Sequence, residues 1–164
     1  MNVSLIAFLL IVVIALLRFD VGWDYVNYYR AVINNDIKRF EPLSQLFLYI
    51  AIQLGLPHLV FLLFGIPTYI LIYSTIRKYS SNIGFSILLY FSFFYLESLG
   101  FIRQSLAVAI CFWAIKYIFS RRFFPFLICV VIATSFHYSA IIVLFAYFMY
   151  QAKLQYLICI LPVG

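Results

Sequence analysis

Long apolar runs without a single charge are the feature that most constrains this chain. Residues 87–96 and 141–150 are two such runs. Transmembrane β-strands alternate polar and apolar residues, whereas a membrane-spanning helix needs about 20 largely apolar residues in succession. Only 10% of the 164 residues are charged and 67% are apolar, so this chain cannot build a water-exposed surface throughout. The sequence therefore predicts an all-α, polytopic membrane protein and excludes soluble, disordered and disulfide-scaffold classes.

Polar turns divide the chain into about six to eight apolar helices within a single membrane domain over 1–164. The predicted helices occupy residues 3–17, 43–56, 59–76, 84–99, 104–119, 123–136, 138–152 and 154–162. No charged n-region precedes the first one, so we interpret it as a retained helix with Arg18 snorkelling at its end. No Gly or Pro marks a turn at His137, so the segment around it is either a hairpin or one long tilted helix.

Residues 18–41 form the main polar segment and carry every acidic residue except Glu97. Gly22 breaks the chain, Asp24 suits the N-cap of a short helix, and the Asn pair at 34–35 suits its end. A stripe at i, i+3, i+4 and i+7 of that helix consists of Tyr25, Tyr28, Tyr29 and Val32. The segment is predicted to be an extracytoplasmic amphipathic loop whose helix lies on the membrane surface.

Residues 43–56 decide the topology, because they are short for a crossing and follow Pro42, which suits a first helical turn. If they cross fully, every basic residue except Arg103 lies on one side. If they are re-entrant or interfacial, 18–41, Arg103 and His137 share one face. The opposite face then carries Arg77, Lys78, Lys116, Arg121, Arg122 and Lys153. The positive-inside rule makes that basic face cytoplasmic in either version. Counting basic residues favours the full crossing, but we favour the second version because it places all five carboxylates outside.

Arg103 and His137 are the ionisable residues best suited to chemistry. An arginine at a membrane boundary is costly, and its planar guanidinium matches phosphate oxygens. The alternative interpretation is a snorkelling Arg103 paired with Glu97. A neutral imidazole can act as a general base near neutral pH, whereas the alternative for His137 is a helix-end histidine hydrogen-bonded to a neighbouring hydroxyl.

Loop charges and tyrosines in the polar segment are weaker candidates. The charges are Asp24, Arg30 and Glu41, and most such charges are simply solvated. Tyrosines at a membrane surface more often mark the interface than bind sugar, but aromatic faces do stack on sugar rings.

Several familiar site motifs are missing from the sequence. It has no Gly-rich phosphate loop, no His/Cys metal cluster and no Gly-x-Ser-x-Gly elbow. Asp20 and Asp24 lack the usual surroundings of a metal-dependent glycosyltransferase site. We therefore predict no metal and no cofactor. The net charge of +6 does not indicate a nucleic-acid partner, because Lys and Arg mainly set topology in a membrane protein.

Four segments, taken in order and spacing, resemble a known family. They are residues 18–25 (Arg-Phe-Asp-Val-Gly-Trp-Asp-Tyr) with the tyrosine pair at 28–29, residues 41–43 (Glu-Pro-Leu), residues 102–107 (Ile-Arg-Gln-Ser-Leu-Ala) and residues 132–140 (Ile-Ala-Thr-Ser-Phe-His-Tyr-Ser-Ala). Together they are similar to the EpsG family of bacterial exopolysaccharide polymerases, relatives of the Wzy-type O-antigen and capsule polymerases. Trp23 departs from the small polar residue that is commoner there. Family members are typically longer, so we interpret the chain as the N-terminal part of a longer pattern.

The resemblance implies a multi-pass glycosyltransferase of the bacterial cytoplasmic (inner) membrane that works beside other polysaccharide export proteins. Such polymerases join oligosaccharide repeat units carried on undecaprenyl pyrophosphate, in contact with membrane lipid. It implies Arg103 beside the departing pyrophosphate, and His137, Asp24 or Glu41 as the base for the acceptor hydroxyl. The substrate-binding residues would be Arg30, Gln104, Tyr25, Tyr28 and Tyr29.

Other functions stay open at this point. A flippase or transporter of lipid-linked glycans should line a central cavity with charges along several helices, whereas the charges here cluster at helix ends. A membrane acyltransferase commonly combines His with Asp or Arg early in the chain, and the motif order differs. An inactive truncated remnant is the third alternative.

Overall fold

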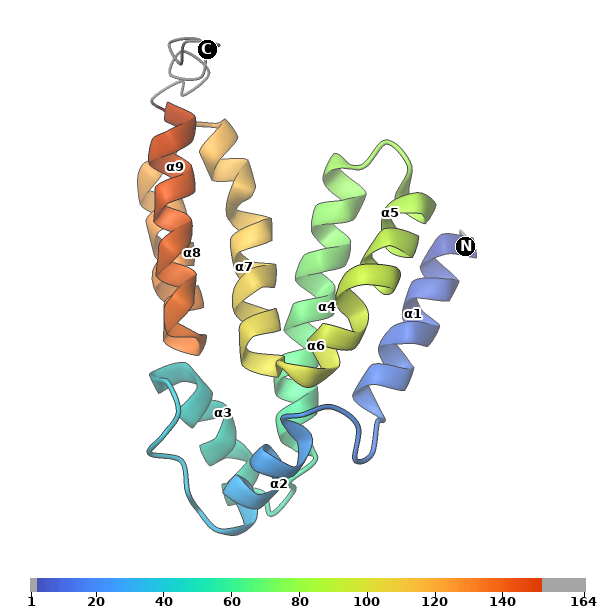
Figure 1. Cartoon of the computed structure of the whole chain (residues 1–164), viewed down its shortest axis with the longest axis vertical. Coiled ribbons are helices and arrows are strands. Elements are labelled where there is room, and N and C mark those ends of the chain that lie inside the picture. Colours follow the sequence, from blue (N-terminus) through green and yellow to red (C-terminus); the bar gives the residue numbers. More distant parts are fainter. Residues whose placement is uncertain (1–2, 152–164) are drawn as a thin grey trace, which may run out of the picture.

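The computed structural model describes residues 3–151, and this part of the chain is helical without any strand (Figure 1). Long helical elements run side by side between two ends of the molecule, and α2 (Tyr25–Ile33) and α3 (Pro42–Gln53) lie at one of these ends. The long elements are α1 (Val3–Leu16), α4 (Leu59–Tyr79), α5 (Ile83–Tyr90) continued by η1 (Phe91–Tyr95) and α6 (Leu96–Gly100), α7 (Ile102–Phe119), α8 (Phe123–Phe136), and η2 (Tyr138–Val143) continued by α9 (Leu144–Gln151). The predicted all-α fold is confirmed.

Three of these elements are long and apolar enough to cross a membrane: Leu59–Tyr79, Ile83–Gly100 and Ile102–Phe119. The apolar helices Leu5–Leu16, Phe123–Phe136 and Tyr138–Gln151 are shorter. Their observed bounds lie within one helical turn of the predicted ones, because continuous apolar runs between polar turns define them. The predicted helix at 154–162 lies outside the described residues.

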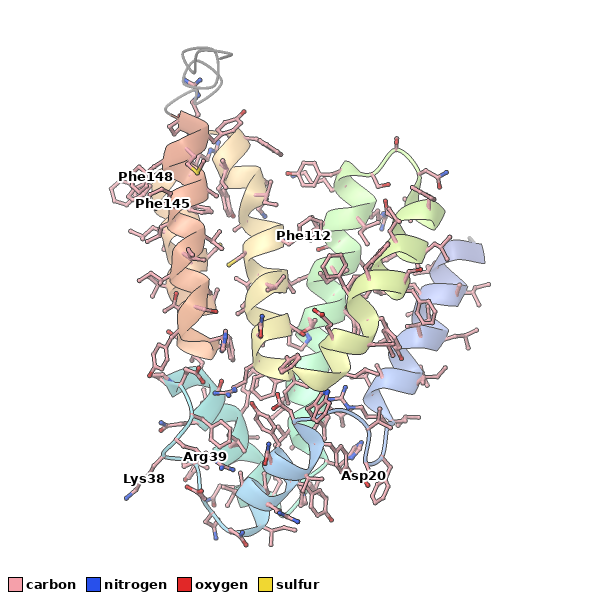
Figure 2. All side chains as sticks on the ribbon, viewed as in Figure 1. Asp20, Lys38, Arg39, Phe112, Phe145 and Phe148 are labelled. Atoms are coloured by element: carbon pink, nitrogen blue, oxygen red, sulfur yellow. The ribbon has the colours of Figure 1, made fainter. Side chains whose placement is uncertain are left out.

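Apolar side chains cover the outer faces of the bundle, as expected where lipid replaces water. Figure 2 shows Phe145 and Phe148 pointing outward from α9, and both side chains are exposed. Asp20, Lys38 and Arg39 instead lie at the end that carries α2 and α3. The chain is therefore a membrane protein, and its α2–α3 end carries acidic as well as basic residues.

α3 begins and ends at the same end of the bundle, so the full crossing of 43–56 is wrong. Its 12 residues span about 18 Å, well short of a hydrocarbon core about 30 Å thick. Pro42 occupies its first turn as predicted. In the turn that follows α3, His58 Nε2 lies 3.1 Å from the carbonyl oxygen of Leu16, the last residue of α1. The segment that follows α3 therefore contacts the C-terminal end of α1.

His137 separates two helices, so the alternative of one long tilted helix is wrong. α8 ends at Phe136, and His137 has an extended backbone with φ −154° and ψ 115°. This conformation lies in the β region, which any residue can adopt, so the turn needs neither Gly nor Pro. The hydroxyl of Ser44 donates a 3.1 Å hydrogen bond to the Phe136 carbonyl, which gives one of the last carbonyls of α8 a partner.

The largest group of buried side chains connects the end layer to the bundle. It includes Tyr28 from α2, Leu48 from α3, Phe64 from α4, Leu106 from α7 and Phe126 from α8. Because all five side chains are almost fully buried, α2 and α3 are packed onto the long helices rather than hanging from them. This packing fixes the positions of the charged residues that lie between the two layers.

Candidate active site

A buried carboxylate, Glu41, connects residues from two other helices. Its Oε2 accepts a hydrogen bond from Arg103 Nη1, and its Oε1 lies 3.5 Å from His137 Nδ1. The Glu41 side chain is only 6% exposed, against 25% for Arg103 and 29% for His137. We call these three residues the Glu41 cluster. Its two nitrogen-bearing groups can meet a substrate, whereas the carboxylate between them is largely shielded from it.

Local backbone breaks bring the three side chains together. Glu41 directly precedes the proline that starts α3, and its own backbone is extended at φ −67° and ψ 158°. Phe101 leaves the helical region at φ −126° and ψ 68°, so Arg103 stands in the first turn of α7. His137 follows α8 in an extended conformation. Each cluster residue therefore stands at or beside a helix terminus, where its side chain can reach across to another element.

Two aromatic rings support the Arg103 guanidinium. Its Cζ lies 5.1 Å from the ring centroid of Phe40 and 5.9 Å from that of Tyr28. Arginine packs favourably over aromatic faces, and the contact restricts the orientation of the planar group. The sequence interpretation missed Phe40 in this role. The available signal was its position beside Glu41 at the end of the polar segment.

Asp24 lies next to the cluster because the preceding loop approaches the junction of α6 and α7. Its backbone N–H donates to the Gly100 carbonyl at 3.2 Å. Gly22 makes this possible with a positive φ of 98°, and a Cβ at that position would collide with the Leu99 carbonyl oxygen. Asp24 does precede α2 as predicted, but its side chain makes no capping hydrogen bond.

Burial raises the pKa of the Asp24 carboxyl above its ordinary value. The charge of Arg103, the backbone N–H of Ile102 and the charge of Arg18 favour the ionised form and offset the burial in part. A carboxyl whose pKa is raised in this way can hold or accept a proton closer to neutral pH. Asp24 is therefore suited to proton transfer at the edge of the Glu41 cluster.

Replacing Asp24 with asparagine should raise the thermal stability of the protein at neutral pH. The pKa of Asp24 is higher in the folded protein than its ordinary value of 3.8. The protonated carboxyl therefore stabilises the fold at a pH below 3.8, and this contribution is lost as the pH rises through the folded-state pKa. Asparagine does not titrate, so the difference in Tm between Asp24→Asn and wild type should grow from acidic to neutral pH. Unfolding scans of purified protein across this range measure it. A difference that shrinks with rising pH would contradict the assigned direction.

Arg18 does not snorkel at the end of the first helix, so that prediction is wrong. Its side chain is buried, with the guanidinium 5.0 Å from the Phe61 ring centroid. Its Nε and Nη2 have no hydrogen-bond partner among the described residues. Burial also lowers the pKa of Arg18, and the nearby Asp24 charge opposes this shift. The side chain lines a small cavity together with residues of α1, α4, α6 and α7, and its charge interacts with Asp24.

The tyrosine stripe of α2 faces the bundle rather than solvent. Tyr25 and Tyr28 are only 4% and 1% exposed, and the Tyr25 ring stacks on Phe61 with centroids 4.7 Å apart. The interpretation that these two rings are available to stack on sugars is therefore wrong. Tyr29 is half-buried and retains some access.

The remaining predicted residues lie away from the Glu41 cluster. Arg30 is exposed on α2, and Gln104 lines a separate groove between α4, α6 and α7. Glu97 lines the same groove, so the alternative pairing of Arg103 with Glu97 is wrong. The structure thus brings together Glu41, Arg103 and His137, with Asp24 adjacent.

No group of three or more metal-ligating side chains is gathered within residues 3–151. Cys111 and Cys129 are buried free cysteines. Cys159 lies outside the described residues. The groups that the candidate site brings together are the guanidinium of Arg103, the imidazole of His137 and the carboxyl groups of Glu41 and Asp24.

These features define a helical membrane protein with a charged site at one end of its bundle. The sequence model of the EpsG family matches residues 1–164, and the chain belongs to this family. The resemblance found in the sequence is confirmed, and it implies a function of the exopolysaccharide polymerase type. No curated protein and no solved structure matches the chain.

Proposed function

We propose that this chain is a membrane glycosyltransferase that polymerises repeat units linked to undecaprenyl pyrophosphate, in the bacterial cytoplasmic membrane. The observation that carries this proposal is the convergence of Arg103 and His137 on the buried Glu41. Bond formation between two lipid-linked glycans needs a cation at a departing pyrophosphate and a base at an acceptor hydroxyl. The Glu41 cluster offers both groups side by side.

In the proposed reaction, the acceptor hydroxyl oxygen attacks the anomeric carbon of the donor chain. A glycosidic C–O bond forms, and the bond between that carbon and the pyrophosphate oxygen breaks. The hydroxyl proton passes to a base and then to solvent, and undecaprenyl pyrophosphate leaves with the electron pair of the broken bond. The lengthened glycan remains on the carrier of the acceptor unit.

Arg103 is the proposed pyrophosphate-binding residue. Its guanidinium has five N–H donors, and the hydrogen bond to Glu41 occupies one Nη1 donor. The other donors can meet phosphate oxygens, while the Phe40 and Tyr28 rings restrict the plane of the group.

His137 is the proposed general base. Glu41 Oε1 faces its Nδ1, which favours a proton on that nitrogen and leaves Nε2 free to accept one from the acceptor hydroxyl. The 3.5 Å separation is longer than an ordinary hydrogen bond, and such contacts commonly tighten when substrate binds. Glu41 is thereby a positioning residue, and Asp24 is a second proton-transfer group nearby.

A histidine substitution tests this proposal. His137→Gln should lower the polymerisation rate by about 10²-fold or more, because an amide cannot take the proton. The variant is introduced into the native gene, and polymer length is measured by gel with membrane abundance of the protein alongside. His58→Gln is the matched control, because His58 lies at the same end but contacts Leu16 instead of the cluster. Normal polymer from His137→Gln would exclude this histidine as the base.

The proposed reaction also requires the Glu41 cluster to face the extracytoplasmic side. The opposite end of the bundle supports this orientation, because it is purely basic among the described residues. Its charges are Arg77, Lys78, Lys116, Arg121 and Arg122. The positive-inside rule assigns such an end to the cytoplasm.

Cysteine labelling tests the orientation. In a Cys-free background, a membrane-impermeant reagent should label Asn34→Cys at the C-cap of α2 in intact cells. Ser81→Cys, in the exposed turn between α4 and α5, should react only after the membrane is opened. Both positions are solvent-exposed, so differences in labelling report sidedness rather than burial. The reverse pattern would place the Glu41 cluster in the cytoplasm and contradict the proposed reaction.

A further inference from the structure

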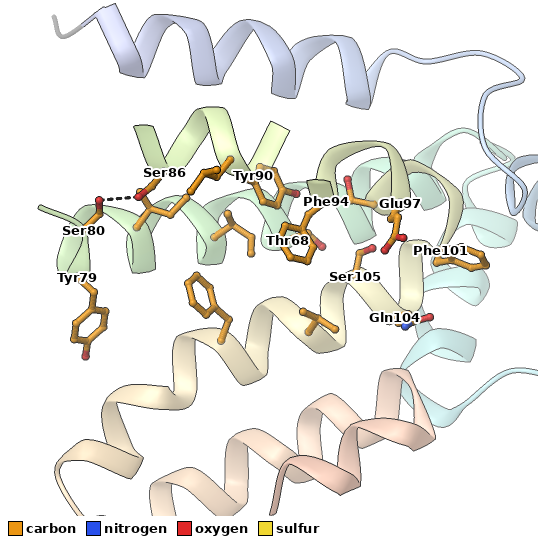
Figure 3. A pocket seen from close by; sticks show the side chains of 16 residues that line it. Thr68, Tyr79, Ser80, Ser86, Tyr90, Phe94, Glu97, Phe101, Gln104 and Ser105 are labelled. Atoms are coloured by element: carbon orange, nitrogen blue, oxygen red, sulfur yellow. Dashed lines mark hydrogen bonds between the residues drawn. The ribbon is translucent and has the colours of Figure 1, made fainter. Parts of the chain in front are cut away.

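A second feature, separate from the Glu41 cluster, is a groove of about 630 Å³ between α4, the α5–η1–α6 element and α7 (Figure 3). These three elements are long and apolar enough to cross a membrane, so the groove lies between candidate membrane spans. Ser80 and Ser86, joined by a 2.8 Å hydrogen bond, lie at one end of it. Glu97, Gln104 and Ser105 lie at the other end, and the walls between are mainly apolar.

Glu97 supplies the negative charge of the groove. It lies within an otherwise apolar candidate span, and it makes no ion pair or side-chain hydrogen bond with residues 3–151. No basic side chain is among the described residues that line the groove. Ionisable residues inside membrane helices are costly and commonly mark functional sites. The Glu97 side chain is exposed toward the groove, whereas the hydroxyl of Tyr90, farther along the same wall, is buried without a partner in the described part of the chain.

An independent observation points to the same wall. The π-helical segment η1 (Phe91–Tyr95) lies between Tyr90 and Glu97 and contributes Phe94 to the groove. π-helical turns are rare, weaken the regular hydrogen-bond pattern and occur frequently at functional sites. The wall that carries the unpaired carboxylate is thus also the wall with irregular helical geometry.

The size of the groove favours a small ligand over a protein helix. A membrane-spanning helix is about 10 Å across and about 27 Å long for 18 residues, which is several times the volume of the groove. Small-molecule sites commonly measure about 300–1,000 Å³, with mainly apolar walls and a few polar groups. One hydrocarbon chain of a lipid fits this description, with its polar end beside Glu97.

The polar end of the groove favours one kind of headgroup. Glu97 presents a hydrogen-bond acceptor with negative charge, whereas the Gln104 amide and the Ser105 hydroxyl can donate. A zwitterion with an ammonium and a phosphodiester matches both kinds of group. A phosphate monoester or pyrophosphate would be repelled by Glu97, and a choline headgroup has no N–H to donate.

We propose that this groove binds one acyl chain of an aminophospholipid of the phosphatidylethanolamine type. The ammonium contacts Glu97, and the phosphodiester contacts Gln104 and Ser105. Gln104 directly follows Arg103, so an occupied groove steadies the first turn of α7 from the side opposite the Glu41 cluster. This lipid site does not depend on the proposed polymerase reaction.

Native mass spectrometry of the detergent-purified full chain tests the proposal. Phosphatidylethanolamine, phosphatidylcholine, phosphatidylglycerol and a polyprenyl phosphate are added at equal concentrations, and the bound fraction of each is measured. Wild-type protein should retain phosphatidylethanolamine about tenfold more tightly than the other three lipids. Equal retention of all phospholipids, or tighter retention of the polyprenyl phosphate, would overturn the proposal.

Two variants locate the bound lipid. Glu97→Gln should abolish the preference for phosphatidylethanolamine, whereas Asp36→Asn, which changes an exposed carboxylate outside the groove, should keep it. Val108→Trp places a large side chain in the groove at a half-exposed position and should lower retention of phosphatidylethanolamine about tenfold. Thermal unfolding confirms that each variant is folded. An unchanged lipid preference in folded Glu97→Gln would overturn the assignment of the headgroup site.

Discussion

Arg103→Lys should impair polymerisation almost as severely as Arg103→Ala, by about 10²-fold or more in rate. Lysine keeps the positive charge but presents it as a compact ammonium. The guanidinium contacts Glu41 through Nη1, packs over the Phe40 ring and still has donors that can meet phosphate oxygens. A single ammonium cannot satisfy Glu41 and a pyrophosphate in the same bidentate geometry, so the charge alone should not sustain activity.

The measurement is the distribution of polymer length from cells that carry each variant in the native gene. Arg39→Lys is the matched control, because Arg39 is an exposed cation at the same end that pairs with Asp36 instead of Glu41. Membrane abundance of every variant is measured in parallel. Full-length polymer from Arg103→Lys would show that only a positive charge is needed at this position, as for a snorkelling residue.

The helices could be predicted from the sequence because hydrophobicity along the chain defines them locally. Apolar runs such as Leu59–Tyr79 and Ile102–Phe119 are bounded by polar turns, and Pro42 marks the start of α3. The short length of the α3 segment also indicated that it does not cross. Each of these inferences needs only neighbouring residues and the thickness of a bilayer.

The partner of Arg103 could not be predicted in this way. Sequence proximity suggested Glu97, but the chain leaves the helical region at Phe101, between the two residues. Glu97 therefore faces the groove, whereas Arg103 faces Glu41, which belongs to a distant part of the chain. Such a pairing depends on how α3 packs onto α7 and α8, and no local pattern encodes that packing.

The α2 stripe shows how a correct pattern can be assigned to the wrong surroundings. The spacing of Tyr25, Tyr28 and Val32 does define one helical face, and all three are buried. Periodicity cannot distinguish a face that lies on lipid or sugar from one that packs on protein. Arg18 was misplaced for a related reason, because residues of α4, α6 and α7 that are distant in the sequence surround its side chain.

Glu41→Ala should produce the largest loss of stability among single changes in the Glu41 cluster. It removes the carboxylate that accepts from Arg103 and faces His137, and it leaves the guanidinium in a partly buried place without its partner. Removing one partner of a buried ion pair typically lowers the free energy of unfolding by about 3–5 kcal/mol. We expect a loss of about 2–3 kcal/mol here because the Arg103 side chain is 25% exposed and water can solvate part of its charge. For a chain of this size, that corresponds to a fall in Tm of roughly 5–10 °C.

The double variant Glu41→Ala/Arg103→Ala distinguishes a lost partner from general damage to the packing. If the cost arises from the uncompensated guanidinium, removing Arg103 as well should restore part of the stability, with a coupling of about 0.5–3 kcal/mol. Unfolding scans of the purified single and double variants measure this coupling, and Asp36→Ala, an exposed carboxylate paired with Arg39 at 3.8 Å, is the control with little expected change. Polymer should be absent from the double variant even where stability returns, because both the anchor and the proposed pyrophosphate ligand are gone. Strictly additive losses would instead mean that Glu41 stabilises α3 by packing alone and that its contact with Arg103 contributes little.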